Sequence, residues 1–319
     1  MIKILYDDSV AKEEWAWYTE YITKKMQKSL RTQNLNTKKS KYLQRKVRLW
    51  LQKTVDDADK IADILLLPLE KLRAKYKLIE IYCRLAKKSE SNVIAAKLLK
   101  SINKEISFLF EYKKIGKKMR WRIAEQMDVK VCPYCNRQYI HAMKDIGYLG
   151  DIDHILDKDT YRLFSLSIWN MLSCCKPCNQ KFKHMSKKDI LSPREAGFDS
   201  DCILQVKAKD TAAILGESDN FTLNWEILPK TPEYKKNKIQ ENIKLFQLDK
   251  QYRFHKDDIK RLLKLKRVYA KGYRDDLNAM LKITDEREFN RLVYGSSLDP
   301  KYFRDELLSK MIYDVVKNN

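Results

Sequence analysis

Two Cys-x-x-Cys pairs, about 40 residues apart, constrain this chain more than any other feature. The first pair is Cys132 and Cys135, and the second is Cys175 and Cys178. A Cys-x-x-Cys turn places two thiolates one ligand-to-ligand distance apart, and Zn²⁺ takes four such ligands in a tetrahedron. We therefore expect the four cysteines to hold one structural Zn²⁺. Because every ligand is Cys, this ion has no open position for chemistry. The competing interpretation is a redox or chance pairing.

The other three cysteines lack this spacing. Cys174 and Cys178 have the spacing Cys-x-x-x-Cys, whereas Cys175 and Cys178 have the spacing Cys-x-x-Cys, so Cys175 is the better zinc ligand. We expect Cys83, Cys174 and Cys202 to be buried as small apolar side chains. Close thiol pairs that stay reduced are typical of the cytosol, so a cytoplasmic protein is expected.

Composition favours a helical protein that binds a polyanion. Only 7 of the 319 residues are Gly, which argues for long helices over turn-rich sheets. Lys and Arg outnumber Asp and Glu 65 to 43. A net charge of +22 is typical of a protein whose partner carries phosphates. The longest apolar run, at positions 61–69, is too short to cross a bilayer, so no membrane partner is expected.

The pattern along the chain predicts a mainly α protein with a small central α+β unit. We expect a helical N-terminal domain at 1–128, a core at 129–195, and a mainly helical region at 196–319. Alternating apolar and polar residues predict a short β segment near 203–228, with strands at 203–209 and 221–228.

Helix ends and basic helix faces can also be read from the sequence. Asp56 or Asp57 would cap one helix, and Ser89 or Ser91 a later one. Lysines and arginines at 39–48 would form a basic face that could contact phosphates.

The segment between the two Cys pairs carries the candidate catalytic residues. It reads DIDH up to His154 and SIWN up to Asn170, and Asn179 directly follows the last Cys. With Asp153, these residues resemble the HNH endonucleases, whose ββα-metal motif is a hairpin and a helix around one divalent cation. The resemblance covers about 55 residues and is specific only in combination. It implies a ββα-metal core with a structural zinc, flanked by helical regions.

The resemblance also implies a role for each residue. His154 would be the general base that takes a proton from the attacking water, since an imidazole titrates near neutral pH. Asp153 and Asn179 would hold a catalytic Mg²⁺ or Mn²⁺ through oxygen atoms. Asn170 would orient the ring of His154 or brace the loop.

Alternatives exist for the metal ligands. Asp151 shares a strand face with Asp153 and could be the ligand instead. His184 could be the last metal ligand instead of Asn179. Five residues on an α-helix separate the two side chains by about 140°, so both cannot easily face one ion. Lys181 is a candidate phosphate neighbour. Lys183 and Arg137 are further candidates for that role, whereas His141 and His255 are expected to be incidental, and Asn136 is expected to be a structural turn residue.

The predicted function is a metal-dependent HNH endonuclease that hydrolyses DNA. The wider pattern resembles stand-alone HNH nucleases of bacterial antiphage defence systems, of the Septu-like or retron-linked kind, which pair with an ATPase. The chain has no G-x-x-x-x-G-K-[ST] loop, so any ATP dependence would come from that partner. The alternative is a non-catalytic zinc-knuckle subunit that binds nucleic acid or scaffolds an ATPase.

Overall fold

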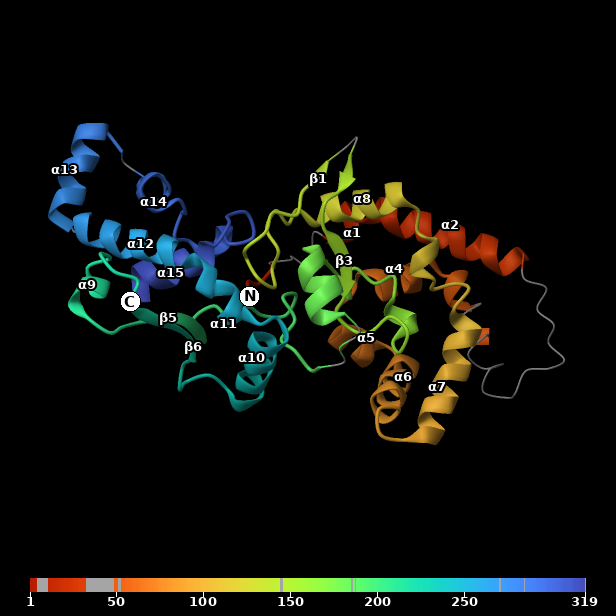
Figure 1. The fold of residues 1–319 in the computed structure, drawn as a ribbon. Helices are drawn as coiled ribbons and strands as arrows, with labels where there is room; N and C mark the ends of the chain where they lie inside the picture. Colours follow the sequence, from red (N-terminus) through yellow and green to blue (C-terminus); the bar gives the residue numbers. More distant parts are fainter. Residues whose placement is uncertain are drawn as a thin grey trace. The chain divides into compact units, whose positions relative to one another are not determined.

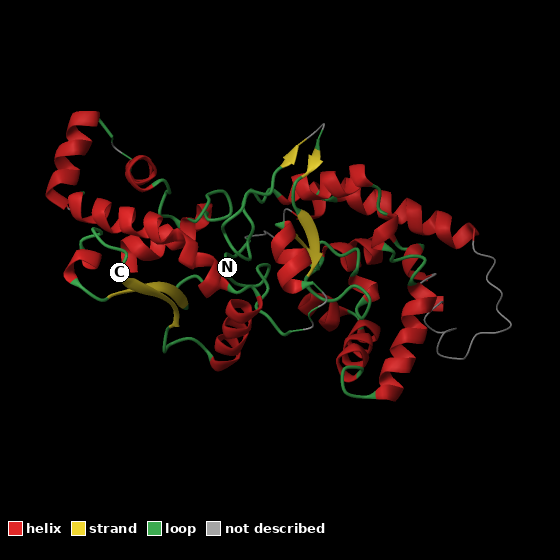
Figure 2. Ribbon diagram, in the orientation of Figure 1, coloured by secondary structure: helices red, strands yellow, loops and turns green. Residues whose placement is uncertain are grey.

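The structure is a computed structural model that describes residues 1–4, 11–32, 49–50, 53–143, 146–184, 186, 188–269, 271–283 and 285–318. Helices dominate these residues, and the strands form small two-stranded sheets (Figure 2). The predicted mainly α class with small β elements is confirmed at this level. The predicted basic face at 39–48 lies outside the described residues. No helix within the described ranges is both long and apolar enough to cross a membrane.

Contacts divide the chain into two compact units, and neither is continuous in sequence. The helical unit comprises Leu5–Arg120 and Ile152–Leu172. The knuckle unit comprises Met1–Ile4, Trp121–Asp151 and Ser173–Asn319. The predicted core at 129–195 therefore contributes residues to both units.

The helical unit is built mainly from α-helices (Figure 1). Tyr18, Ile22 and Met26 recur every four residues and are buried along one face of α2. The elements of this unit are α1 (Ala11–Glu14), α2 (Ala16–Thr32), α4 (Ala58–Leu66), α5 (Leu69–Lys75), α6 (Lys77–Lys88), α7 (Val93–Ile106), and the 3₁₀ turns η2 (Tyr112–Lys114) and η3 (Arg162–Phe164).

Several hydrogen bonds fasten the segment 152–172 to these helices. The Tyr18 hydroxyl donates to the carbonyl of Leu166 at 2.7 Å. The Ile168 N–H donates to the carbonyl of Leu65 at 2.9 Å. Residues far apart in sequence therefore support the loop that follows His154.

The knuckle unit contains the remaining elements. Helix α8 (Lys117–Met127) begins in the helical unit and ends here. The others are β1 (Ala142–Met143), β2 (Gly147–Tyr148), β5 (Cys202–Ala208), α9 (Thr211–Ile214), β6 (Phe221–Ile227), α10 (Glu233–Leu245), α11 (Leu248–Tyr252), η5 (Arg253–His255), α12 (Lys256–Val268), α13 (Lys271–Leu281), α14 (Glu286–Tyr294), η6 (Pro300–Tyr302) and α15 (Ser309–Asn318).

The predicted β segment is confirmed. Strands β5 and β6 pair antiparallel in a register that runs from Cys202 opposite Ile227 to Ala208 opposite Phe221. Their alternating residues Cys202, Leu204, Phe221 and Leu223 are buried, as the pattern predicts. Helix α15 packs against β5 and α12.

The helix caps were predicted correctly in one of two cases. The Asp57 carboxylate accepts from the Lys60 N–H at 3.1 Å and caps α4. Helix α7 begins after Asn92, whose side chain accepts from the Ala95 N–H at 2.9 Å. The predicted cap at Ser89 or Ser91 is wrong, because Ser89 still has α-helical backbone angles at the end of α6.

Candidate metal centre and polar site

The four predicted zinc ligands come together in the knuckle unit. The Sγ atoms of Cys132, Cys135, Cys175 and Cys178 all lie within 4.8 Å of one another, and all four residues are buried. The Sγ atoms of Cys135 and Cys175 are 3.9 Å apart. Four thiolates about 2.3 Å from a tetrahedral Zn²⁺ would be separated by about 3.8 Å. The cluster therefore fits a metal such as zinc.

The composition of the cluster excludes Cys174, as predicted from spacing. Cys174 is fully buried next to the cluster but is not part of it. Hydrogen bonds with Cys132, Cys135 and Cys175, followed by burial, raise the pKa of Cys178 well above its usual value. Because metal ligation requires thiolates, binding of Zn²⁺ would release protons.

Asn136, directly after the first Cys pair, is a fully buried anchor. Its backbone has a positive φ of 53°, which Asn tolerates better than most residues. Its Nδ2 donates to the carbonyls of Phe303 and Glu306 at 3.2 Å each. Its Oδ1 accepts from the Lys310 N–H at 3.0 Å and from the Ser309 hydroxyl at 3.2 Å. These four bonds tie the first Cys pair to the start of α15, so the structural interpretation of Asn136 is supported.

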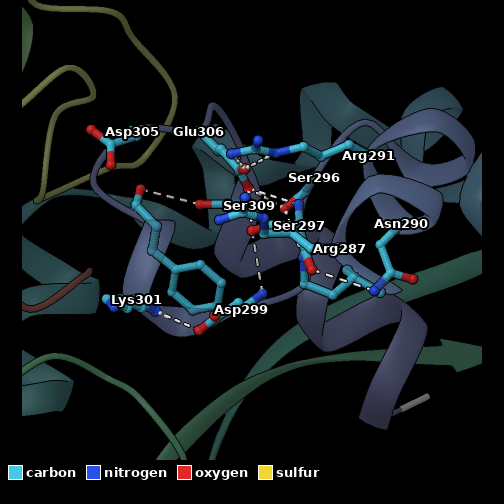
Figure 3. Close-up of polar contacts among 12 residues, drawn as sticks. Arg287, Asn290, Arg291, Ser296, Ser297, Asp299, Lys301, Asp305, Glu306 and Ser309 are labelled. Atoms are coloured by element: carbon cyan, nitrogen blue, oxygen red, sulfur yellow. Dashed lines mark hydrogen bonds and ion pairs between the residues drawn. The ribbon is translucent and has the colours of Figure 1, made fainter. Parts of the chain in front are cut away.

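The Glu306 side chain stabilises the loop that receives Asn136 (Figure 3). One carboxylate oxygen accepts from the Ser297 N–H and hydroxyl at 2.9 Å each and from the Ser296 hydroxyl at 2.8 Å. The other oxygen accepts from Arg291 at 2.9 Å. Burial opposes ionisation of Glu306, but these donors outweigh it and hold its pKa below the usual value.

The segment around the second Cys pair has the order strand, strand, helix. Strand β3 (Asp151–His154) pairs with β4 (Met171–Cys174), and the π-helix η4 (Pro177–Lys183) follows. The chain passes between the two units within each of the two strands. A Cβ atom at Gly150 would lie 2.5 Å from the Cys174 carbonyl oxygen, so only glycine permits this approach of the chain.

Asp151 is the carboxylate that Asn179 contacts. The Asn179 Nδ2 donates to Asp151 Oδ2 at 3.0 Å, and the Gln180 amide donates to the same oxygen at 2.8 Å. Asp151 is half-buried and Asn179 is half-buried, so both remain open to solvent. This pair favours the alternative in which Asp151, rather than Asp153, works with Asn179. Asp153 is only 5% exposed.

The winding of η4 removes the angular argument against His184. The His184 N–H donates to the carbonyl of Asn179 at 2.7 Å, five residues back. This is the i→i+5 bond of a π-turn, in which five residues complete about one turn of the backbone. His184 itself is exposed and has a positive φ of 42° at the end of η4. The separation of about 140° expected for an α-helix therefore does not apply here.

His154 lies buried in the helical unit and is oriented by a backbone carbonyl. It is 7% exposed, and its Nε2 lies 2.9 Å from the carbonyl oxygen of Ser165. The ring of Tyr112 packs against it edge-on at a centroid distance of 4.6 Å. A carbonyl only accepts, so a neutral ring carries its proton on Nε2 and its basic lone pair on Nδ1, a tautomer inferred from the hydrogen bond.

Asn170 braces the loop that presents this carbonyl. Its Oδ1 accepts from the Leu156 N–H at 2.6 Å, and its Nδ2 donates to the carbonyls of Leu156 and Phe164 at 3.1 Å each. Phe164 directly precedes Ser165. Of the two roles considered for Asn170, the observed bonds correspond to bracing the loop, which in turn positions the Ser165 carbonyl for His154.

Comparison with known proteins adds no relative. No family model, no curated protein and no solved structure matches the chain. The assignment of a function therefore rests on the geometry of the cluster in the knuckle unit and of the polar residues within each unit.

The basic candidates near the Cys pairs differ in exposure. Lys181 is exposed on η4, as a phosphate neighbour requires, whereas Lys183 is only 6% exposed. Arg137 is engaged within the protein, because its guanidinium donates to Gln251 at 2.6 Å and to His255 Nε2 at 2.8 Å. Lys181 is therefore the better candidate of the three.

Some partners in this region have no sequence signature. Ser165 acts through its backbone carbonyl, and Tyr112 contacts His154 through its ring edge. His255, expected to be incidental, links Arg137 to Asp258 through its two ring nitrogens at 2.8 Å and 2.9 Å. Apart from the contact of His255 with Asp258, which is three residues away, these contacts join residues that are 11 to 118 positions apart, so spacing alone could not have identified them.

Proposed function

We propose that this protein is a metal-dependent endonuclease of the HNH type that hydrolyses DNA phosphodiester bonds. The observation that carries the proposal is the orientation of His154 by the Ser165 carbonyl, which leaves Nδ1 as the basic nitrogen. A base held in one tautomer is suited to take a proton from water. The closed Cys cluster and the strand, strand, helix order support the same proposal.

Strand β3 and helix η4 carry side-chain oxygen atoms that would suit a catalytic cation. Asp151 and Asn179 are the pair that we assign to this role, because they contact each other and are only half-buried. Asp153 lies on the same face of β3 and is the alternative carboxylate. A bound Mg²⁺ or Mn²⁺ would stabilise charge on the phosphate and on the departing 3′ oxygen. Lys181 would contact a neighbouring phosphate.

A second candidate function is favoured by the burial of the catalytic candidates. Asp153 and His154 are 5% and 7% exposed, and His154 is bonded to a carbonyl and packed on an aromatic ring. The same contacts would suit a purely structural histidine. In that case the chain would be a zinc-knuckle subunit that binds nucleic acid or scaffolds an ATPase.

One experiment separates the two candidates. Wild type, His154→Ala and His141→Ala are incubated with supercoiled plasmid DNA and either Mg²⁺ or Mn²⁺, and the zinc content of each protein is measured. His141 is an exposed histidine close to the first Cys pair and serves as the matched control. Loss of one general base typically costs about 10²- to 10⁴-fold in rate.

We expect His154→Ala to lose cleavage and keep its zinc, while His141→Ala cleaves like the wild type. Cleavage by His154→Ala at the wild-type rate would contradict the proposal. A wild type that binds DNA without cleaving it would favour the second candidate. The antiphage role and the ATPase partner stay predictions from the resemblance, and repeating the assay with that partner would test them.

A further inference from the structure

The turn between α11 and α12 exposes an aromatic side chain to solvent. Phe254 is 83% exposed, which is the highest value for any large apolar side chain in the described part of the chain. It lies in η5, which joins the two helices directly (Figure 1). Because an exposed phenyl ring gains nothing from burial, its role in the isolated fold is small.

Both neighbours of the Arg253–Phe254 pair are hydrogen-bonded to the segment 135–137, which contains the second Cys of the first pair. Tyr252 is 1% exposed, and its hydroxyl donates to the carbonyl of Cys135 at 2.7 Å. His255 accepts from Arg137 at 2.8 Å. The turn is therefore held from both sides within the knuckle unit, so little conformational entropy would be lost when Phe254 contacts a ligand.

The chain around this turn is strongly basic. Between positions 250 and 267 it has eight Lys and Arg and two Asp. Arg253, Arg261 and Lys264 are exposed, and none of them forms an ion pair with a described residue. Asp257 is engaged by Lys260 at 3.2 Å. An exposed aromatic ring among unpaired cations matches a ligand that combines flat apolar faces with phosphates.

We propose that the Arg253–Phe254 turn binds single-stranded nucleic acid. Phe254 stacks on an unpaired base, while Arg253 and the exposed basic side chains of α12 contact the phosphates. Bases within a duplex already stack on both faces, so Phe254 can stack only on a base of an unpaired segment. It rests on the proposed function only in naming nucleic acid as the bound partner, and it does not require cleavage.

The test measures binding in a His154→Ala background, in which the proposed cleavage is absent. The probes are a fluorescent oligothymidine and an abasic oligonucleotide of the same length, which keeps the phosphates and lacks the bases. Phe254→Ala should bind the oligothymidine about 5- to 100-fold more weakly, the effect expected for one lost stacking contact. Its affinity for the abasic probe should not change.

Tyr234→Ala is the matched control, because Tyr234 is an exposed aromatic residue of the same unit, on α10, with 70% exposure. This variant should bind both probes like its parent. Phe254→Trp should retain binding, and its fluorescence should be quenched by the oligothymidine and not by the abasic probe. Arg253→Ala should reduce the salt dependence of binding by about 0.7 in the log–log slope.

Two outcomes would overturn the proposal. In the first, Phe254→Ala binds both probes like its parent, and Phe254 would then be a contact for a protein partner. In the second, Phe254→Ala binds both probes more weakly by the same factor, and the substitution would then affect only contacts with the phosphate backbone of the nucleic acid. Cleavage by the wild type without a role for Phe254 would contradict this inference only, whereas Phe254-dependent binding without cleavage would contradict the nuclease proposal only.

Discussion

The two asparagines that follow the two Cys pairs have the same position in the sequence motif and different surroundings. The N–H of Asn136 donates to Cys132 at 2.7 Å, and the N–H of Asn179 donates to Cys175 at 3.1 Å, so both turns close in the same way. The Asn136 side chain is fully buried and bonded to backbone and a hydroxyl of the α15 region. The Asn179 side chain is half-buried and faces a carboxylate. The repeated Cys-x-x-Cys-Asn motif therefore determines the turn, but it does not determine which groups the Asn side chain contacts.

The largest effect is expected where the two turns meet, at the Cys cluster. Cys178→Ser should lose its metal and unfold the knuckle unit, since structural zinc in small domains contributes on the order of 10 kcal/mol or more to folding. Zinc content by mass spectrometry and the thermal melt by circular dichroism measure this. Cys174→Ala, which alters a buried thiol outside the cluster, should keep the metal. Full zinc content in Cys178→Ser would show that the cluster is not a four-ligand site.

Asn136→Ala should come second, with a loss of about 3 kcal/mol in the free energy of unfolding, because it leaves buried groups of the α15 region without partners. Urea unfolding measures the loss. Asn136→Gly also removes the side chain but accepts the positive φ, so it should recover about 1 kcal/mol of the loss. A change below about 0.5 kcal/mol, the range of ordinary surface substitutions, would show that these bonds do not anchor the first turn.

Glu306→Gln should have the third-largest effect. We expect a loss of about 1 to 2 kcal/mol in the free energy of unfolding, because a charged acceptor of four hydrogen bonds becomes neutral. The folded-state pKa of Glu306 is lowered, so its contribution is present above the ordinary Glu pKa of about 4.3 and is lost as the pH falls through the folded-state value. Unfolding measured between neutral and acidic pH should therefore show a smaller acid loss in Glu306→Gln than in the wild type. Equal acid losses in the two proteins would argue against this role.

Asn179→Ala should have the smallest effect on stability, below about 1 kcal/mol, since only one partly exposed bond is lost. If Asn179 is a metal ligand, its removal should lower the rate of plasmid cleavage by about 100-fold. Gln180→Ala is the matched control, because Gln180 donates to the same oxygen of Asp151 at 2.8 Å. Similar rates for the two variants would mean that Asn179 acts only by holding Asp151.

Much of the fold could be predicted because its signals are local. The strands β5 and β6 follow from alternation, and the cap at Asp57 follows from a side chain that reaches its own helix. The wrong prediction of a cap at Ser89 or Ser91 also comes from relying on local signals. The residues Ser89, Ser91 and Asn92 are all of types that favour helix starts, and the position where α6 ends decides among them.

The candidate site was predictable in residue types and only partly in pairing. Strand periodicity places Asp151 and Asp153 on one face and cannot choose between them. The choice depends on Asn179, which lies 28 residues from Asp151 and reaches it through the π-wound η4. A π-turn has no sequence signature comparable to a cap, so an α-helix was assumed for this segment.

The sequence by itself determined the cysteine cluster, the helical class and the basic character of this protein. Each of these follows from short spacing or from composition, which do not depend on the fold. Only the tertiary structure decided that Asn136 is an anchor, that Asp151 faces Asn179, and that the Ser165 carbonyl orients His154. These contacts join groups between 11 and 174 residues apart, and such contacts depend on how the whole chain packs.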